Sequence, residues 1–190
     1  MLFDFSNFTA KVSELNHLHK SLHELSDLRW RTQKAEDIAR WENAVRAWKE
    51  YSGFGEDTKF YFFENNTFLS ALAAGEADAK ESAIRFLEFD PYYYRSGYIK
   101  SKLLVRLKNV LLTASEIRRL QKVVVNAVLS RLPKCEFKYY ARLLKNIGTP
   151  EFRQKLQELS VPELPFLKAR QMCCLQEVYW AEKSKNHRKS

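Results

Sequence analysis

The stretch Ser82-Ala-Ile-Arg85 returns as Ser115-Glu-Ile-Arg118 and again as Pro150-Glu-Phe-Arg153, at offsets of 33 and 35 residues. Between these stretches, Leu107-Lys-Asn-Val110 is echoed 37 residues later by Leu144-Lys-Asn-Ile147. A period of this length is typical of helix pairs that cannot bury their apolar faces alone and therefore stack on one another. The sequence thus predicts repeated helix pairs from Glu76 onward.

Capping residues predict where these helices begin and end. Thr113-Ala-Ser-Glu116 has the form of a capping box, and Thr149-Pro150 offers an N-cap hydroxyl followed by proline at the first helical position. Pro133 and Gly148 fall between the predicted helices, where residues that interrupt helices belong.

The repeats resemble those of the HEAT and armadillo families of helical-repeat proteins over about residues 76–180. This resemblance implies a right-handed α-solenoid of stacked helix pairs. It also implies a binding surface, most often for protein and sometimes for nucleic acid.

The first 75 residues have a different pattern. Apolar residues at helical spacing predict two amphipathic helices that pair as an antiparallel hairpin, and residues 59–74, which end before Gly75, predict a third helix. The hairpin stripe includes Leu15, Leu18, Leu22, Trp41 and Trp48. We therefore expect an all-α protein with an N-terminal helical region at 1–75, a solenoid at 76–182 and a disordered basic tail at 183–190.

Composition narrows the class of protein. The chain has 190 residues, of which 45% are hydrophobic, so it can build a core. Only 5 Gly and 5 Pro are present, too few for the many turns of an all-β fold. The absence of a signal-peptide pattern and of a long apolar run, with an odd set of cysteines at 135, 173 and 174, predicts a cytoplasmic protein without membrane segments.

The charge is unevenly distributed. Residues 1–95 contain 12 Lys and Arg against 16 Asp and Glu, whereas residues 96–190 contain 20 against 7. The net charge of +9 therefore combines a mildly acidic first half with a second half of +13. Such asymmetry indicates a polyanionic partner, which can be nucleic acid or an acidic protein surface.

Helical spacing arranges these cations in stripes that could merge into one band in a solenoid. The alternative is that each stripe is only the solvated face of its helix. The candidate polyanion-binding residues are Arg95, Lys100, Lys102, Arg106, Arg118, Arg119, Lys122, Lys134, Lys138, Arg142 and Lys145.

An aromatic segment, Tyr92-Tyr93-Tyr94, lies beside these cations and continues to Tyr98. Exposed, it would stack on bases or hold a peptide; buried, it would pack between repeats. The recurring Arg85, Arg118 and Arg153 suggest a structural ladder in which they pair with carboxylates or helix carbonyls of the neighbouring unit. The carboxylates within reach are Glu81, Glu116 and Glu151.

Catalytic signatures are weak. His19 and His23 have the spacing of two metal ligands on one helix, and His17 is close, but no third ligand follows in a known arrangement, so we expect no metal site and no cofactor. Asp90 beside the tyrosines permits a remote alternative, a DNA glycosylase-like repair enzyme.

The sequence leads to one principal hypothesis, a non-enzymatic helical-repeat protein whose basic second half binds a polyanion, most plausibly nucleic acid. The alternative is a protein–protein adaptor that uses the solenoid or the N-terminal hairpin.

Overall fold

The computed structural model of the chain describes residues 2–52, 62–93, 95–132 and 134–187, with side chains described as far as Tyr179. Within these residues the chain forms nine α-helices and one short 3-10 helix. The helices are α1 (Phe8–Thr32), α2 (Ala35–Ser52), α3 (Asn66–Ala74), α4 (Ala77–Phe89), α5 (Ser96–Leu107), α6 (Ala114–Leu129), α7 (Phe137–Ile147), α8 (Pro150–Gln157) and α9 (Pro165–His187), and η1 (Phe62–Glu64) precedes α3. The all-α prediction is confirmed.

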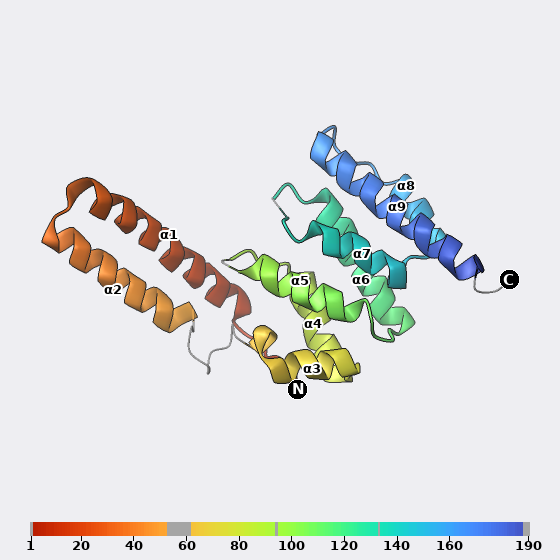
Figure 1. Ribbon diagram of the computed structural model, residues 1–190, viewed down its shortest axis with the longest axis horizontal. Helices are drawn as coiled ribbons and strands as arrows, with labels where there is room; N and C mark the ends of the chain where they lie inside the picture. The colour runs from red at the N-terminus through yellow and green to blue at the C-terminus, as the bar shows by residue number, and fades with distance from the viewer. Residues whose placement is uncertain (1, 53–61, 94, 133, 188–190) are drawn as a thin grey trace.

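Helices α1 and α2 form the expected antiparallel hairpin, which projects away from the remaining helices (Figure 1). The turn lies at Gln33, which has a left-handed conformation with φ of 58° and donates its backbone N–H to the carbonyl of Arg29. At the tip, the guanidinium of Arg29 lies 3.6 Å from the centre of the Trp41 ring. The described residues of α1 that are fully buried are Phe8 and Leu15, both on the part nearest the other helices.

The remaining helices follow one another across the molecule (Figure 1). Helices two places apart in the chain pack together: α3 on α5, α4 on α6, α5 on α7 and α7 on α9. Their facing residues form one continuous core that includes Leu72, Phe86, Leu103, Val124 and Leu144.

Local capping predictions are confirmed. Thr113 and Glu116 form a complete capping box at the start of α6, and the Thr149 hydroxyl accepts a hydrogen bond from the backbone N–H of Phe152 with Pro150 at the first helical position. Gly75 ends α3 with φ of 81°, a left-handed conformation that glycine adopts without strain.

The predicted helix at 59–74 is wrong in part. The chain instead forms η1 and then begins α3 anew, because the Asn65 side chain accepts a hydrogen bond from the backbone N–H of Thr67 and so caps a separate helix. Residues 59–61 lie outside the described part of the chain.

The N-terminal segment joins both sides of the predicted boundary at residue 75. The backbone N–H of Phe3 donates to the Ser82 hydroxyl of α4, and the Phe3 ring lies 4.7 Å from the ring of Phe63. Phe63 in turn lies 4.4 Å from Phe86 of α4. At the other end of the chain, α9 extends to His187, beyond the start of the basic segment 183–190.

The carboxylate pairing expected in the ladder is wrong at Glu81 and Glu116, which pair with other cations. Glu81 pairs with Arg119, and Glu116 pairs with Lys80. Arg85 lies 4.5 Å from the centre of the Phe5 ring. The repeated sequence positions therefore do not share one environment. Among the described helices none carries an apolar stretch of the length needed to span a bilayer.

Candidate nucleic-acid interface

A groove opens between α5 and the start of α7, with a volume of about 640 Å³. We call it the basic groove. It is lined by Arg95, Gly97, Tyr98, Ser101, Lys102, Val105, Arg106, Cys135, Glu136, Lys138 and Tyr139. Four of the predicted polyanion-binding residues are therefore brought together here, three from α5 and the residue that precedes it and one from α7, with one carboxylate in the lining.

Three of the four cations are oriented by contacts with η1 and α3. Arg95 and Lys102 each donate to the same Glu64 carboxylate oxygen, at 3.1 Å. The Arg106 guanidinium donates to the backbone carbonyls of Leu69 and Lys102, both at 3.2 Å. Arg106 thus keeps its full charge while its orientation is fixed, because carbonyls hold the guanidinium without neutralising it.

Lys138 forms the opposite wall. It is exposed and makes no ion pair with a carboxylate of the described residues, and its amine lies 5.1 Å from the centre of the Tyr139 ring. The guanidinium of Arg142, one helical turn further along α7, lies 5.9 Å from the same ring. This wall therefore presents positive charge beside an aromatic face.

The groove also exposes apolar surface. The Tyr98 side chain is 68% exposed and Val105 is 42% exposed, both on α5. The arrangement combines fixed cations with accessible aromatic rings, which are the two kinds of group that bind nucleic acid without reading base edges.

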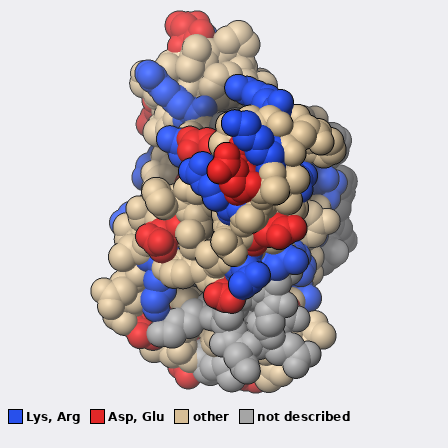
Figure 2. Space-filling view, turned by 90° about the vertical axis from the view of Figure 1, so that its left-hand side faces the viewer, with Lys and Arg blue, Asp and Glu red and all other residues tan. Residues whose placement is uncertain are grey.

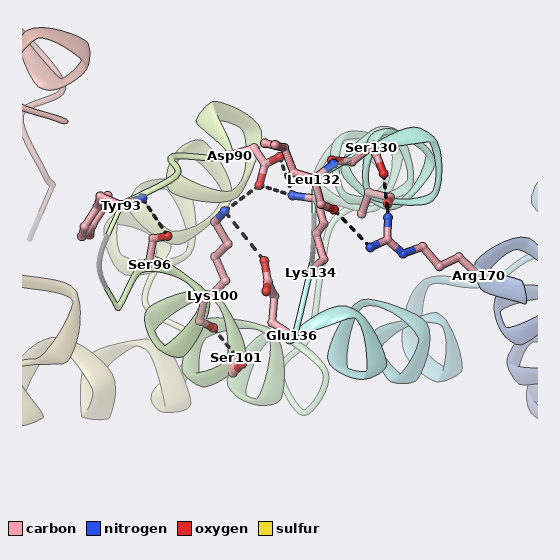
Figure 3. Close-up of polar contacts among 12 residues, drawn as sticks. Asp90, Tyr93, Ser96, Lys100, Ser101, Ser130, Leu132, Lys134, Glu136 and Arg170 are labelled. Carbon is pink, nitrogen blue, oxygen red and sulfur yellow. Dashed lines mark hydrogen bonds and ion pairs between the residues drawn. The ribbon is translucent and has the colours of Figure 1, made fainter. Parts of the chain in front are cut away.

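Lys100 and Lys134, which we predicted on the binding face, lie inside the molecule (Figure 3). Lys100 donates to Asp90 at 2.7 Å, and Lys134 donates to both Asp90 carboxylate oxygens at 2.8 and 2.7 Å. Glu136 lies 3.8 Å from the Lys100 amine. These four side chains, all buried except the partly exposed Asp90, form what we call the buried ion cluster.

Lys134 does not lie on the predicted helical stripe, because α7 begins only at Phe137 and Lys134 belongs to the preceding connection. Burial lowers the pKa of Lys100, and the hydrogen bond and charge of Asp90 offset only part of that shift. Burial and the nearby negative charges of Asp90 and Glu136 raise the pKa of Tyr140. The cluster ties the ends of α4, α5 and α7 together.

Gly97 lies in the groove lining beside Glu136 of this cluster. A Cβ atom at residue 97 would lie 3.0 Å from a carboxylate oxygen of Glu136, so glycine allows the buried carboxylate to approach the first turn of α5.

The other predicted cations lie elsewhere. Arg119 is held by Glu81 and Glu88, whose hydrogen bonds raise its pKa, and Lys145 lies 3.5 Å from Glu177. Arg118 and Lys122 are exposed on α6, outside the groove lining. The structure therefore does not gather the eleven predicted residues on one face.

Charge on another face is mixed. Figure 2 views the molecule from the side on which the hairpin lies in Figure 1, and there Lys and Arg are interspersed with Asp and Glu. No extended patch of one sign is visible among the described residues on that face.

The tyrosine segment is divided between the two predicted environments. Tyr92 is 58% exposed and its carbonyl accepts a hydrogen bond from Asn16 of α1, whereas Tyr93 is buried. Tyr94 lies outside the described residues. A smaller cavity of about 340 Å³ lies beside Tyr92, between α1 and the connections that precede α5 and α7.

The candidate metal and catalytic residues are also located. The Nε2 atoms of His19 and His23 lie 3.2 Å apart, and burial together with His23 lowers the pKa of His19. No group of three metal-ligating side chains occurs among the residues that the structure describes. Asp90, on which the glycosylase alternative depended, receives hydrogen bonds from two buried lysines.

Sequence reasoning missed Tyr139 and Glu64 and did not include Tyr98 among the site residues. Tyr98, Lys102 and Arg106 are each separated by four residues, so their spacing alone places them on one face of a helix. Glu64 had no such signal, since it meets Arg95 and Lys102 only through the fold. No known family model, no curated protein and no solved structure matches this chain.

Proposed function

We propose that this protein is a non-enzymatic helical-repeat protein that binds nucleic acid through the basic groove. The observation that carries the proposal is the convergence of Arg95, Lys102, Arg106 and Lys138 on one groove. Phosphate contacts from such side chains supply most of the sequence-independent affinity for nucleic acid. Lys100 and Lys134 are left out of the contact set because their side chains are buried against Asp90.

The salt dependence of binding tests this proposal. Four phosphate contacts predict a slope of log K against log salt of about −3 for a single strand, since each contact contributes about −0.7. Replacing Lys138 with Glu should weaken binding and reduce the slope by about 1.

Lys155→Glu is the matched control. Lys155 is exposed on α8, outside the groove lining, and its replacement changes the net charge by the same amount. Equal losses for the two variants would mean that overall charge, rather than the groove, determines affinity. A flat salt dependence or the absence of binding to DNA and RNA would refute the proposal.

A protein–protein adaptor is the second candidate function, and the hairpin favours it. Trp30 is 67% exposed at the tip, and the apolar stripe between α1 and α2 is only half-buried beyond Leu15. An interface on this surface would be mainly apolar, so its affinity would change little with salt. Binding of a protein partner that survives high salt and is lost on Trp30→Glu would support this function.

We also propose that α4–α9 form a right-handed α-solenoid of stacked helix pairs. Support comes from the packing of helices two places apart in the chain. In such a stack each unit contacts only its neighbours. Hydrogen exchange tests this, because protection should then decrease gradually toward α8 and α9, whereas a single globular core would exchange as one unit.

A further inference from the structure

We propose that the ligand of the basic groove is a single-stranded nucleic acid, with one base stacked on Tyr98. This inference rests on the proposed function and adds the class of ligand to it. Three features carry it: the exposed Tyr98 ring, the line of cations beside that ring, and the size of the groove.

Tyr98 has the geometry of a stacking platform. It lies in the first turn of α5, its side chain is 68% exposed, and it lines the groove together with Lys102. A large exposed ring next to fixed cations loses little conformational entropy on binding, because its helix already holds its backbone in place. Stacking an unpaired base on such a ring is sequence-tolerant, since every base has a π-face.

The cations beside the ring form a line. Lys102 and Arg106 follow Tyr98 at successive helical turns, about 6 Å apart along α5. Such spacing suits a chain of phosphates, whereas an isolated phosphate would be held by cations that converge on one point. Tyr139, with Lys138 beside it on α7, gives the second wall the same combination of ring and cation.

The groove suits a single strand better than a duplex. A volume of about 640 Å³ is that of a pocket for a small ligand or for a short piece of a polymer. Recognition of duplex DNA usually places a protruding helix or strand in a major groove about 12 Å wide. Here the cations and rings line a hollow, and the bases of a duplex would not reach them because they are stacked and paired.

The test measures fluorescence anisotropy with labelled 12-nucleotide probes at one fixed salt concentration. The probes are oligo-thymidine, oligo-uridine, an abasic DNA strand of equal charge, and a 12-base-pair duplex. We expect the wild-type protein to bind at least one of the two base-containing single strands about tenfold more tightly than the abasic strand. We also expect that strand to bind more tightly than the duplex.

Three variants test whether Tyr98 causes the preference for base-containing strands. Tyr98→Leu should lose most of the preference for the base-containing strand while its affinity for the abasic strand is unchanged. Tyr98→Phe, which keeps the ring, should retain the preference. Tyr92→Leu is the matched control, since Tyr92 is similarly exposed but is not part of the groove lining.

The outcomes separate this inference from the proposed function. Binding of the base-containing and abasic strands with equal affinity would overturn base stacking and leave nucleic-acid binding intact, as would tighter binding of the duplex. Loss of the base preference in Tyr92→Leu but not in Tyr98→Leu would overturn the assignment to Tyr98. Failure to bind any probe would overturn both.

Discussion

The α1–α2 hairpin and the α3–α9 part of the molecule differ in how completely they bury their apolar side chains. Among the described residues of α2, the apolar side chains are at most half-buried, because α1 is their main neighbour. Helix α4 contacts α3, α5 and α6, and it fully buries Ile84 and Phe86. Phe8 and Leu15 at the base of α1 join the main core, but beyond them the hairpin depends mainly on the α1–α2 interface, so its stability should be lower.

The same difference separates the two candidate functions. The basic groove lies on helices that share the main core, and its cations are held by Glu64 and by backbone carbonyls. The exposed Trp30 and the half-buried stripe lie on the less supported hairpin. The charged groove thus lies on the helices that share the main core. The apolar surface lies on the hairpin, which has fewer buried contacts.

The largest expected effect comes from removing a core ring in α4. Phe86→Ala should lower the free energy of unfolding by about 3–5 kcal/mol, because it leaves a cavity among Phe8, Phe63 and neighbouring side chains. Leu25→Ala in the hairpin should cost only about 1 kcal/mol, since Leu25 is half-buried. Urea denaturation followed by circular dichroism measures the first change.

Tryptophan fluorescence measures the hairpin separately. Three of the 4 tryptophans of the sequence, at positions 30, 41 and 48, lie in α1 and α2, so a Trp180→Phe background reports on the hairpin alone. We expect the fluorescence transition to precede the circular dichroism transition in urea. Coincident transitions would contradict a less stable hairpin.

The buried ion cluster should have the next largest effect. Lys134→Met should lower the free energy of unfolding by about 2 kcal/mol, since it removes two charge-assisted hydrogen bonds to Asp90 and leaves that carboxylate to Lys100 alone. Thermal denaturation measures the change, with Lys138→Met as a control because that lysine is exposed and has no ion pair among the described residues. Equal melting temperatures for the two variants would contradict a stabilising cluster.

The capping box of α6 should contribute about 1 kcal/mol, the expected cost of Thr113→Ala.

Burial opposes ionisation of Glu116, but hydrogen bonds from Thr113 and Lys80 outweigh it and lower the pKa of Glu116. Because the folded pKa is lowered, this carboxylate stabilises the protein above its unfolded value of 4.5, and the contribution is lost as pH falls through the folded pKa. Glu116→Gln should therefore be less stable than wild type at pH 7, with the gap narrowing toward pH 3. A gap that is independent of pH would contradict this role.

The smallest effect is a gain in the hairpin. Gln33 adopts φ of 58° at the end of α1, a conformation that costs a residue with a side chain more than it costs glycine. Gln33→Gly should stabilise the hairpin by about 0.5 kcal/mol, visible as a shift of the tryptophan transition alone. A matching shift of the whole circular dichroism curve would show that the hairpin and the core unfold together.

Local rules predicted most of the helices. Thr113, Thr149 and Gly75 act on neighbours within a few residues, so their effect can be read from the sequence, and the hairpin stripes depend only on spacing. The separate start of α3 was missed because residues 59–74 carry apolar side chains at helical spacing, which concealed the capping role of Asn65.

The site was less predictable, because its contacts are long in sequence. Lys134 meets Asp90 across 44 residues, and Lys102 meets Glu64 across 38. Spacing on one helix can show that Tyr98, Lys102 and Arg106 share a face, but it cannot show whether another segment covers that face. Other segments of the chain cover Lys100 and Lys134, whereas Lys102 and Lys138 remain accessible in the groove.

Cys135 gives the groove a chemical reporter of its own. Its side chain is exposed and lines both the groove and the smaller cavity next to it, whereas Cys174 is buried and burial raises the pKa of Cys173. Alkylation with iodoacetamide should therefore modify Cys135 first, and a strand lying in the groove should slow that reaction. Occupancy of the groove could then be followed by mass spectrometry on the unlabelled wild-type chain, without a substitution or an attached dye.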